Sequence, residues 1–303
     1  MSAQVAVAVV SWNTRDLLER CLRSLEPDAE AGLAEVCVVD NASDDGSPDL
    51  VRERFPWARL VASEENLGFG RAVNLAARQT DAPWVGVANA DIRLRDGALR
   101  QLLDAAGRDP EAGALAPRLI LTDGSTQHSV FPFPSPAVSL AVALGLPGVG
   151  DRLLLPGSWD ETRERRVPWA VAAFLLVRRD GWDAVGGFDE QHWMYAEDLD
   201  LGWRLARAGF PTRYIPSAEV EHEHGAATEK AWGDERSLRW QRNSYAWMLR
   251  RRGWLFTRTV ALIELAGAAV RYVVLSNSRT RWRWWMRMHR TGLERASLLR
   301  AQR

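Results

Sequence analysis

The sequence predicts an α/β fold in which a mostly parallel sheet is flanked by helices. Short apolar runs that end in turn-forming residues alternate with segments whose apolar residues recur at helical spacing. Strands and helices in this alternation form parallel sheets with right-handed crossovers. The chain has 303 residues, of which 47% are hydrophobic and 26% are charged, so it is long enough for one large domain with an appendage.

The first strand is expected at Val5–Val10, and the segment 16–25 follows it with apolar residues at helical spacing. A second strand is expected at Val36–Val39. Ser47 is the predicted N-cap of the next helix, with Pro48 at its first position, because these residue types are favoured at those two places.

An acidic residue, Asp40, directly follows the second strand. In dinucleotide-binding folds a carboxylate at this place accepts hydrogen bonds from a ribose or a base edge. The Asp, Asn, Ser and Gly residues of 40–47 are equally typical of a turn, in which case Asp40 needs no ligand. This segment alone leaves both interpretations open.

Two glycines, Gly68 and Gly70, precede a segment with helical periodicity. Glycine lets the backbone approach a ligand closely, and a helix N-terminus favours phosphate groups. The segment 66–74 is not a Walker loop and lacks the full dinucleotide fingerprint, so it is a weak indication when taken by itself.

The apolar run 84–88 predicts a buried strand that ends in Asn89-Ala90-Asp91. In open α/β sheets ligands bind beyond the carboxyl ends of the strands, and Asn89 and Asp91 point the same way because side chains alternate along a strand. A carboxylate at this place suits Mg²⁺ or Mn²⁺ holding a diphosphate. The alternative is that Asp91 only caps the turn at 93–97.

The segments 9–13, 38–47, 66–74 and 89–91 resemble, in order and spacing, motifs of the family 2 glycosyltransferases. These enzymes have the GT-A fold and use nucleotide-diphosphate sugars, and the resemblance over residues 5–228 is closest to bacterial rhamnosyltransferase-like members. It implies that Asp40 holds the nucleoside and that Asp91 ligates a metal ion. The donor-binding residues that it implies are Ser11, Asn13, Asp40, Asn41, Asn66, Gly68, Arg71, Asn74, Asn89 and Asp91.

Helical spacing resumes at 99–103, and further strands are expected at 114–121 and 169–178. The residues between, 122–167, are rich in Pro and Gly, and the run 131–136 excludes a regular helix or central strand. Because a long irregular segment in a compact domain is commonly functional, we expect acceptor-side loops there. A variable surface excursion is the alternative.

From Tyr195 the pattern is helical, and Glu197, Asp198 and Asp200 lie in the first turn. The helix dipole alone would favour each acid there by about 0.3–1 kcal/mol. The stretch 186–201 also resembles the Gly-Gly-Phe-Asp and Glu-Asp-x-Asp-Leu motifs of the same family. The resemblance implies that Asp198 is the catalytic base. We expect the acceptor side of the site to be lined by Trp169, Glu197, Asp200 and Arg204.

A last strand is expected at 211–216, and two histidines follow it, His222 and His224. Imidazoles two residues apart can share a metal ion, although a surface histidine is more often only solvated. The family often carries a histidine here, followed by small residues and Ser or Thr, and His222 matches this pattern better than His224. The resemblance therefore implies Asp91 and His222 as candidate ligands of Mg²⁺ or Mn²⁺.

From Glu229 the sequence becomes helical in pattern and rich in Arg and Trp, so we expect a GT-A catalytic domain at 1–228 and a helical extension at 229–303. Three charges interrupt the apolar segment 254–275, and each costs roughly 2.5–3.5 kcal/mol near a bilayer centre, which argues against a stable span. The Arg and Trp residues of 279–290 suit an anionic lipid surface. Docking on the catalytic domain, or on a second subunit in a homodimer, is the alternative.

The resemblance therefore implies a metal-dependent, inverting glycosyltransferase. By resemblance it moves a sugar, with rhamnose as the expected one, from a nucleotide-diphosphate sugar to a hydroxyl of a saccharide or polyprenyl-linked acceptor. A formal net charge of zero gives no reason to expect nucleic acid as a partner. The N-terminal residues do not form a signal peptide, which predicts a cytoplasmic protein, peripheral on the inner face of the plasma membrane.

Two other functions are compatible with these motifs. One is a catalytically degenerate, membrane-associated scaffold that binds sugar nucleotides without turnover. The other is a sugar nucleotidyltransferase, which has a similar nucleotide-binding half. That class needs a Gly-rich basic loop after the first strand, where this chain has Ser11-Trp12-Asn13-Thr14.

Overall fold

The computed structural model describes residues 3–145, 150–155, 159–192, 194–223 and 235–274, together with residues 283, 286, 287, 289, 290 and 294. The chain divides into two compact units, of which unit 1 comprises Met1–Phe131 and Asp160–Ala231, and unit 2 comprises Pro132–Trp159 and Trp232–Arg303. This division differs from the expected boundary at residue 229, because residues 132–159 group with the C-terminal helices. Each unit is described by itself below.

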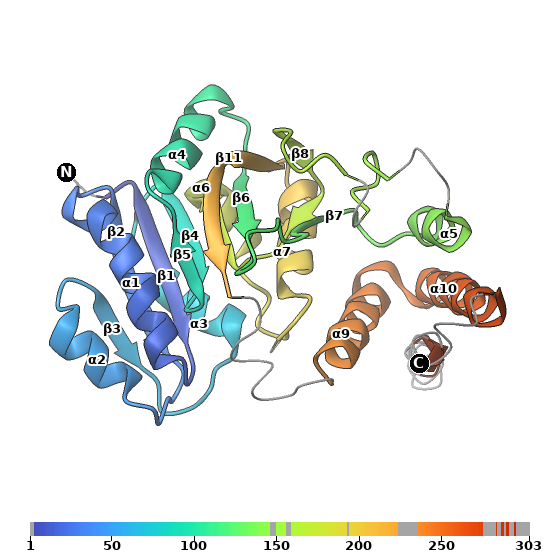
Figure 1. The fold of residues 1–303 in the computed structure, drawn as a ribbon, viewed down its shortest axis with the longest axis horizontal. Helices are drawn as coiled ribbons and strands as arrows, with labels where there is room; N and C mark the ends of the chain where they lie inside the picture. Colours follow the sequence, from blue (N-terminus) through green and yellow to red (C-terminus); the bar gives the residue numbers. More distant parts are fainter. Residues whose placement is uncertain are drawn as a thin grey trace. The chain divides into compact units, whose positions relative to one another are not determined.

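The first half of the unit 1 sheet consists of four parallel strands in the order β3-β2-β1-β4 (Figure 1). The strands are β1 (Val5–Ser11), β2 (Ala34–Asp40), β3 (Arg59–Ala62) and β4 (Trp84–Asn89). The helices that connect them are α1 (Arg15–Glu30), α2 (Ser47–Arg54) and α3 (Phe69–Ala77). Side chains on both faces of β1, such as Ala6, Val7 and Ala8, are buried, as expected for a parallel strand covered by helices.

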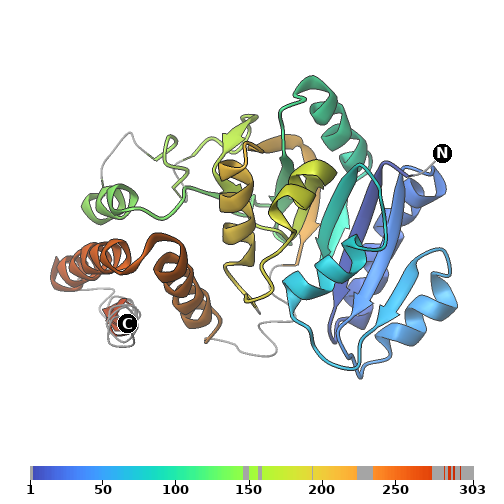
Figure 2. The same ribbon diagram turned by 180° about the vertical axis from the view of Figure 1, so that it is seen from behind.

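The chain reverses its direction across the sheet at β1. The strands β2 and β3 are added on one side of β1, and β4 is added on the other. Because βαβ crossovers are right-handed, α1 and α2 cover one face of the sheet while α3 covers the opposite face (Figures 1 and 2). Ligands of open α/β sheets bind beyond the carboxyl ends of the strands at such a switch point, which here lies beyond Ser11 and Asn89.

The second half of the sheet is mixed. The strand β10 (Phe174–Arg178) runs antiparallel to β4 and to β6 (Ala114–Ile120), and β11 (Thr212–His222) runs parallel to β6. A bulge divides β11, so its first part pairs with β8 (Arg165–Val167) and its last part with β5 (Ile92–Leu94). The remaining elements of unit 1 are α4 (Ala98–Arg108), α6 (Arg179–Val185), α7 (Glu197–Arg207), and a small sheet of β7 (Val130–Phe131) and β9 (Trp169–Ala170).

Three elements differ from those expected from the sequence. The run 169–178 is not one strand, because its two ends pair in different sheets as β9 and β10. The helix expected from Tyr195 begins at Glu197, because Tyr195 and Ala196 adopt left-handed backbone conformations with φ of 63° and 67°. Ser47 is not an N-cap: Gly46 takes that position, and the Ser47 hydroxyl donates to Asp45 at 2.6 Å.

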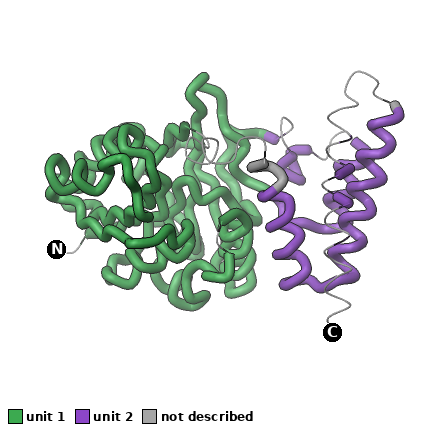
Figure 3. Tube along the Cα trace, turned by 90° about the horizontal axis from the view of Figure 1, so that it is seen from below, with its two compact units in different colours: residues 1–131, 160–231 green, residues 132–159, 232–303 purple. Residues whose placement is uncertain are grey.

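Unit 2 contains the helices α5 (Pro136–Leu144), α9 (Glu235–Arg252) and α10 (Trp254–Val274), and Figure 3 distinguishes its residues from those of unit 1. The Ser135 side chain caps α5 by accepting a hydrogen bond from the N–H of Val138. Within the described ranges, none of the helices has the length and apolar character that crossing a bilayer requires. Residues His224, Trp282 and Trp285, to which the sequence pointed, lie outside the described residues.

Candidate active site

Asp91 lies in the short connection between β4 and the edge strand β5. Its side chain is almost completely buried, and its carbonyl oxygen accepts a hydrogen bond from the N–H of Glu223 at 2.9 Å. Because His222 pairs with Ile92 in the β5–β11 ladder, the end of β11 is fixed beside Asp91. The structure therefore brings together the two residues that the sequence suggested as metal ligands.

The imidazole of His222 lies between two oxygen atoms. Its Nε2 is 3.2 Å from Oδ1 of Asp91, and its Nδ1 is 2.6 Å from the amide oxygen of Gln127. An amide oxygen only accepts hydrogen bonds, so Nδ1 carries a proton and donates it to Gln127. The close approach of Nε2 of His222 to Oδ1 of Asp91 is then stabilised either by a proton on Nε2 or by a cation that both atoms bind.

This donor set fits a divalent cation. A buried carboxylate oxygen and an imidazole nitrogen converge, and the other ring nitrogen is held by a side-chain amide, which is how metal-binding histidines are commonly oriented. Imidazole and carboxylate ligands together suit Mn²⁺ or Zn²⁺ better than Mg²⁺, which prefers oxygen ligands and water. Gln127 was not found from the sequence, where no motif marks it within the irregular segment 122–167.

Asp198 lies in the first turn of α7, where only Glu197 separates it from the two residues with left-handed backbone. Its carboxylate accepts hydrogen bonds from the N–H groups of Leu199, at 2.8 Å, and of Ala172. Desolvation nevertheless raises the pKa of Asp198, and these hydrogen bonds oppose that shift only in part. Left-handed non-glycine residues are costly and concentrate at functional sites, so the strained turn is consistent with a catalytic position.

A short chain of backbone contacts connects Asp198 to the metal-ligand pair. Asp198 accepts from the N–H of Ala172, and the carbonyl oxygen of the adjacent Ala173 accepts from the N–H of Asn89 at 2.9 Å. Asn89 ends β4, two residues before Asp91. The two carboxylates that the sequence assigned to catalysis and to metal binding therefore belong to one region at the carboxyl end of β4.

Three other residues expected on the acceptor side take different places. Asp200 is completely buried and accepts from Nε of Arg204 at 2.6 Å, while the same guanidinium donates to the carbonyl oxygen of Val185. This ion pair connects α7 to the end of α6, so its evident role is structural. Trp169 is also buried and stacks on Phe131, with ring centroids 4.9 Å apart.

Glu197 differs from its neighbour Asp198 in its surroundings. Its side chain is buried, and among the described residues Oε2 has no hydrogen-bond partner. Desolvation, together with the charge of Asp198, raises the pKa of Glu197. A carboxyl group in these surroundings holds its proton to higher pH than an exposed glutamate does.

Asp40 lies at the carboxyl end of β2, as the sequence predicts. One oxygen accepts from the N–H of Ser43 at 2.9 Å, and Oδ2 is buried without a hydrogen-bond partner among the described residues. Burial raises the pKa of Asp40. The nearby Ser11 hydroxyl is buried too, 3.2 Å from the hydroxyl of Thr14. A buried acceptor at the switch point of the sheet is suited to a donor group of a bound nucleoside.

Two asparagines near Asp40 hold the loops around it. The side-chain oxygen of Asn13 accepts a hydrogen bond from the backbone N–H of Asp44 at 2.9 Å. The backbone N–H of Asn13 donates to the hydroxyl of Ser43, also at 2.9 Å. Asn41 is buried and spans to the glycine loop, where its amide contacts the backbone of Leu67 and Gly68 at 3.4 Å. Their side chains thus hold the loops around Asp40 in place.

The segment 66–74 continues this scaffold. The Asn66 side chain accepts from the N–H of Gly68, whose φ of 77° is a left-handed conformation that favours glycine. Asn74 makes two hydrogen bonds of 2.9 Å with the backbone of Phe188, so it fastens α3 to the stretch before α7. Arg71 is exposed, with Nε 3.9 Å from Glu190, and of these residues its side chain is the most accessible to a diphosphate.

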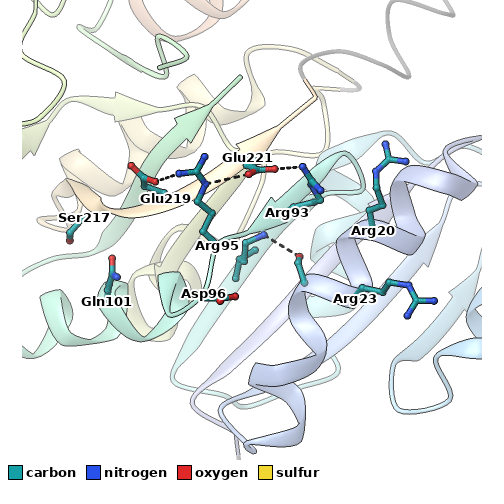
Figure 4. Close-up of a pocket in the computed structure, with 11 residues that line it drawn as sticks. Arg20, Arg23, Arg93, Arg95, Asp96, Gln101, Ser217, Glu219 and Glu221 are labelled. Atoms are coloured by element: carbon teal, nitrogen blue, oxygen red, sulfur yellow. Dashed lines mark hydrogen bonds and ion pairs between the residues drawn. The ribbon is translucent and has the colours of Figure 1, made fainter. Parts of the chain in front are cut away.

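A concavity of about 740 Å³, which we call the outer pocket, lies on the outer side of β5 and β11 (Figure 4). Its charged groups pair with each other: Arg93 with Glu221, and Arg95 with both Glu219 and Glu221. These cations are already neutralised by the neighbouring strand, so we assign no ligand to this pocket. The ion pairs hold β5 against β11 and thereby fix the two candidate metal ligands side by side.

Comparisons with known proteins bear on the family to which the chain belongs. The chain matches the family model of glycosyl transferase family 2 over residues 6–130 and that of glycosyl transferase family group 2 over residues 151–293. It is 38% identical over 247 residues to the N-acetylglucosaminyl-diphospho-decaprenol L-rhamnosyltransferase of Mycobacterium tuberculosis. The aligned region covers 75% of this chain and 78% of that protein. The chain is 31% identical to a pre-mycofactocin glycosyltransferase of the same species, over 73% of this chain and 43% of that protein.

Solved structures agree on the fold. A mannosyltransferase from Pyrobaculum calidifontis, in complex with GDP-Man and Mn²⁺, is similar with a TM-score of 0.60 and 20% identity, over 98% of this chain and 87% of that chain. GalNAc-T7, solved with UDP, GalNAc and Mn²⁺, has a TM-score of 0.56 and 15% identity, over 72% of this chain and 43% of that chain. The expected α/β fold of the GT-A type is therefore confirmed. With this fold, these family models and a relative of 38% identity, the chain belongs to the family 2 glycosyltransferases.

Proposed function

We propose that this glycosyltransferase transfers its sugar in one displacement, with inversion at the anomeric carbon and with Asp198 as the base. The observation that carries the proposal is the short backbone path from Asp198, through Ala172 and Ala173, to Asn89 and the pair of Asp91 and His222. A base and a diphosphate-holding site in one region are what a single displacement requires. No covalent intermediate and no nucleophilic side chain are needed.

In this mechanism Asp198 takes the proton of an acceptor hydroxyl as that oxygen attacks the anomeric carbon. Its raised pKa suits the role, because a base whose pKa is closer to neutrality accepts a proton more readily. Leu199 and Ala172 donate to its carboxylate and hold it in place. Base assistance of this kind contributes typically 10²–10⁴-fold to the rate, in order-of-magnitude terms.

The donor is proposed to bind at the switch point of the sheet. Asp40 and Ser11 would contact the nucleoside, Arg71 is available to the diphosphate, and Asp91 and His222 would hold a divalent cation beside it. Such a cation, when bound, neutralises the charge that develops on the leaving diphosphate. Asn13, Asn41, Asn66 and Asn74 are proposed to position these groups, because their amides are engaged with the backbone.

The named activity of the mycobacterial relative suggests the substrates. We propose that the donor is a nucleotide-diphosphate rhamnose and that the acceptor is a sugar carried on a polyprenyl diphosphate, by analogy with that relative. A lipid-linked acceptor resides in a membrane, so the enzyme would work as a peripheral protein at the inner face of the plasma membrane. The sequence identity of 38% supports the reaction class more strongly than it supports the exact sugars.

A donor panel tests this proposal. The protein is incubated with UDP-, GDP- and dTDP-linked sugars, with Mn²⁺ or Mg²⁺, and release of nucleoside diphosphate is measured with and without a polyprenyl-linked acceptor. We expect one donor, dTDP-rhamnose, to be consumed faster with acceptor, and chelation of the metal to stop the reaction. Tight binding of a sugar nucleotide without turnover of any donor would favour a non-catalytic scaffold instead.

A further inference from the structure

The helix α10 exposes a row of large apolar side chains. Leu255, Leu262, Val270 and Val273 are 70%, 47%, 61% and 73% exposed, and their spacing of seven, eight and three residues places them on one side of the helix. Contiguous exposed apolar surface marks a site of interaction with a protein, a ligand or a membrane.

Two polar residues of α10, Glu264 and Thr257, face the interior of unit 2. Glu264 accepts from the Ser139 hydroxyl at 2.9 Å and from the Tyr245 hydroxyl at 2.7 Å, and Nδ1 of His289 lies 3.0 Å from the same carboxylate. Thr257 is completely buried on the same side. One of the three charges that argued against a membrane span, Glu264, is therefore satisfied inside the unit, and the outward face carries apolar side chains together with the exposed Arg258.

The helix α5 adds a second exposed apolar surface. Leu140, Val142 and Leu144 are 48%, 44% and 61% exposed. The two helices pack closely, because a Cβ at Gly267 of α10 would lie 2.8 Å from Cβ of Ala143 of α5. All eight large hydrophobic side chains that are exposed among the described residues belong to unit 2, and seven of them lie on α5 and α10.

The charge of this part of the chain identifies its partner. Residues 232–303 contain 16 Arg and no Lys against four Asp and Glu, which is a formal net charge of +12 in a chain whose total is zero. Arginines also flank the aromatic residues of α10: the guanidinium of Arg252 lies 4.2 Å from the ring centroid of Phe256, and that of Arg258 lies 5.1 Å from that of Trp254. Apolar side chains fringed by Arg and aromatic rings match the boundary between anionic headgroups and acyl chains.

We propose that the exposed faces of α5 and α10 form a membrane-binding surface that takes anionic lipid, with α10 lying in the plane of the bilayer. The inference rests on the proposed function, because a lipid-linked acceptor is the reason why this enzyme would need to bind a membrane. It assigns to membrane binding the segment 136–144, which lies in the stretch where the sequence suggested acceptor loops. A second copy of the chain is a less suitable partner for this surface, because two segments that each carry a formal net charge of +12 repel each other.

Vesicle sedimentation of the full chain, without sugar substrates, tests the proposal. We expect the protein to sediment with vesicles of phosphatidylcholine containing 30% phosphatidylglycerol, and to sediment less with vesicles of pure phosphatidylcholine. High salt should reduce sedimentation with the anionic vesicles. The double substitution Leu255→Gln and Val273→Gln should weaken the vesicle affinity by more than about tenfold, because each residue loses burial in the acyl region. Both residues are exposed, so the thermal unfolding temperature should stay unchanged and show that the variant folds.

A pair of charge reversals provides the matched control. Arg258→Glu, on the exposed face of α10, should weaken binding to anionic vesicles, whereas Arg100→Glu, an equal charge change on α4 of unit 1, should do so much less. Equal binding by the double variant and the wild type, or no sedimentation with either vesicle, would overturn the proposal. So would self-association that the double variant abolishes. Because no sugar substrate is present, these outcomes are independent of whether the proposed transfer reaction is correct.

Discussion

Nε2 of His222 lies 3.2 Å from Oδ1 of Asp91, although the two residues are separated by 131 positions in the chain. The pairing of β11 with β5 brings them together, and the outer ion pairs between these strands maintain their register. Two atoms that both accept hydrogen bonds when deprotonated are stable at this distance only around a shared proton or cation. The first prediction follows from this contact.

Substitution of either residue should remove cation binding. We expect Asp91→Asn and His222→Ala to abolish saturable Mn²⁺ binding measured by electron paramagnetic resonance, and to reduce transfer activity in parallel. Asp96→Asn is the control, because Asp96 is an exposed acid in the next connection, between β5 and α4. Unchanged Mn²⁺ affinity in Asp91→Asn would exclude this pair as the metal site.

Gln127 is expected to act through His222. Replacing it with Leu removes the acceptor that holds Nδ1, so the imidazole loses its fixed tautomer and orientation. We predict Mn²⁺ affinity about 10–100-fold weaker, the range typical for such supporting residues, while the unfolding temperature changes little. Gln101→Leu serves as the control, since Gln101 lines the outer pocket. Mn²⁺ affinity that is equal in both variants would contradict this role.

Removal of the base should affect the chemical step more than donor binding. Asp198→Asn keeps the shape of the side chain but cannot take a proton, so we expect kcat to fall roughly 10²–10⁴-fold. The dissociation constant for the donor, measured by calorimetry, should stay within a few-fold of the wild type. Asp183→Asn, an exposed acid on α6, should leave both quantities unchanged. A large loss of donor affinity in Asp198→Asn would point to a role in binding instead.

The pH dependence of transfer should reflect the same group. Asp198 must be ionised to act as a base, and desolvation raises its pKa above that of an ordinary aspartate. As the pH falls through the raised pKa, the base becomes protonated and kcat should decline, at a higher pH than the usual value of about 4. The residual activity of Asp198→Asn should lack this acidic limb. The same limb in both proteins would assign it to another group.

The raised pKa of Glu197 predicts how the free energy of unfolding depends on pH. Its pKa is raised in the folded protein, so between the unfolded value of about 4.3 and the raised value the folded state holds a proton that the unfolded state has released. Raising the pH through this window therefore lowers the free energy of unfolding. We expect Glu197→Gln to gain thermal stability relative to wild type as the pH rises, whereas the exposed Glu64→Gln should not. A constant difference across pH would contradict the assignment.

Residues that lie at the ends of strands were predictable from the sequence. Asp40 and Asp91 follow apolar runs directly, and the position of a residue in a parallel sheet is fixed by where its strand ends. Asp198 and His222 required the family resemblance, because an acid in a first helical turn and a histidine after a strand are both common without any catalytic role. The α/β fold itself followed from the alternation of periodicities.

Other features depend on contacts between distant segments, which local pattern does not contain. Gln127 has no motif of its own, and its importance comes only from the ring of His222 opposite it. Asp200 and Arg204 have the spacing of a surface pair on a helix, yet burial of α7 against α6 turns them into an internal ion pair. Asn74 likewise contacts Phe188, more than a hundred residues away, rather than an open donor site.

The central claim is that Asp198 and the Asp91–His222 pair serve one inverting transfer reaction. It is tested most directly by incubating the protein with dTDP-rhamnose, Mn²⁺ and polyprenyl-diphosphate-linked N-acetylglucosamine, and by determining the anomeric configuration of the product by nuclear magnetic resonance. We predict a rhamnosylated lipid product whose anomeric configuration is opposite to that in the donor, and which the Asp198→Asn variant forms roughly 10²–10⁴-fold more slowly. A product with the configuration retained, or formed at the wild-type rate by Asp198→Asn, would contradict the mechanism.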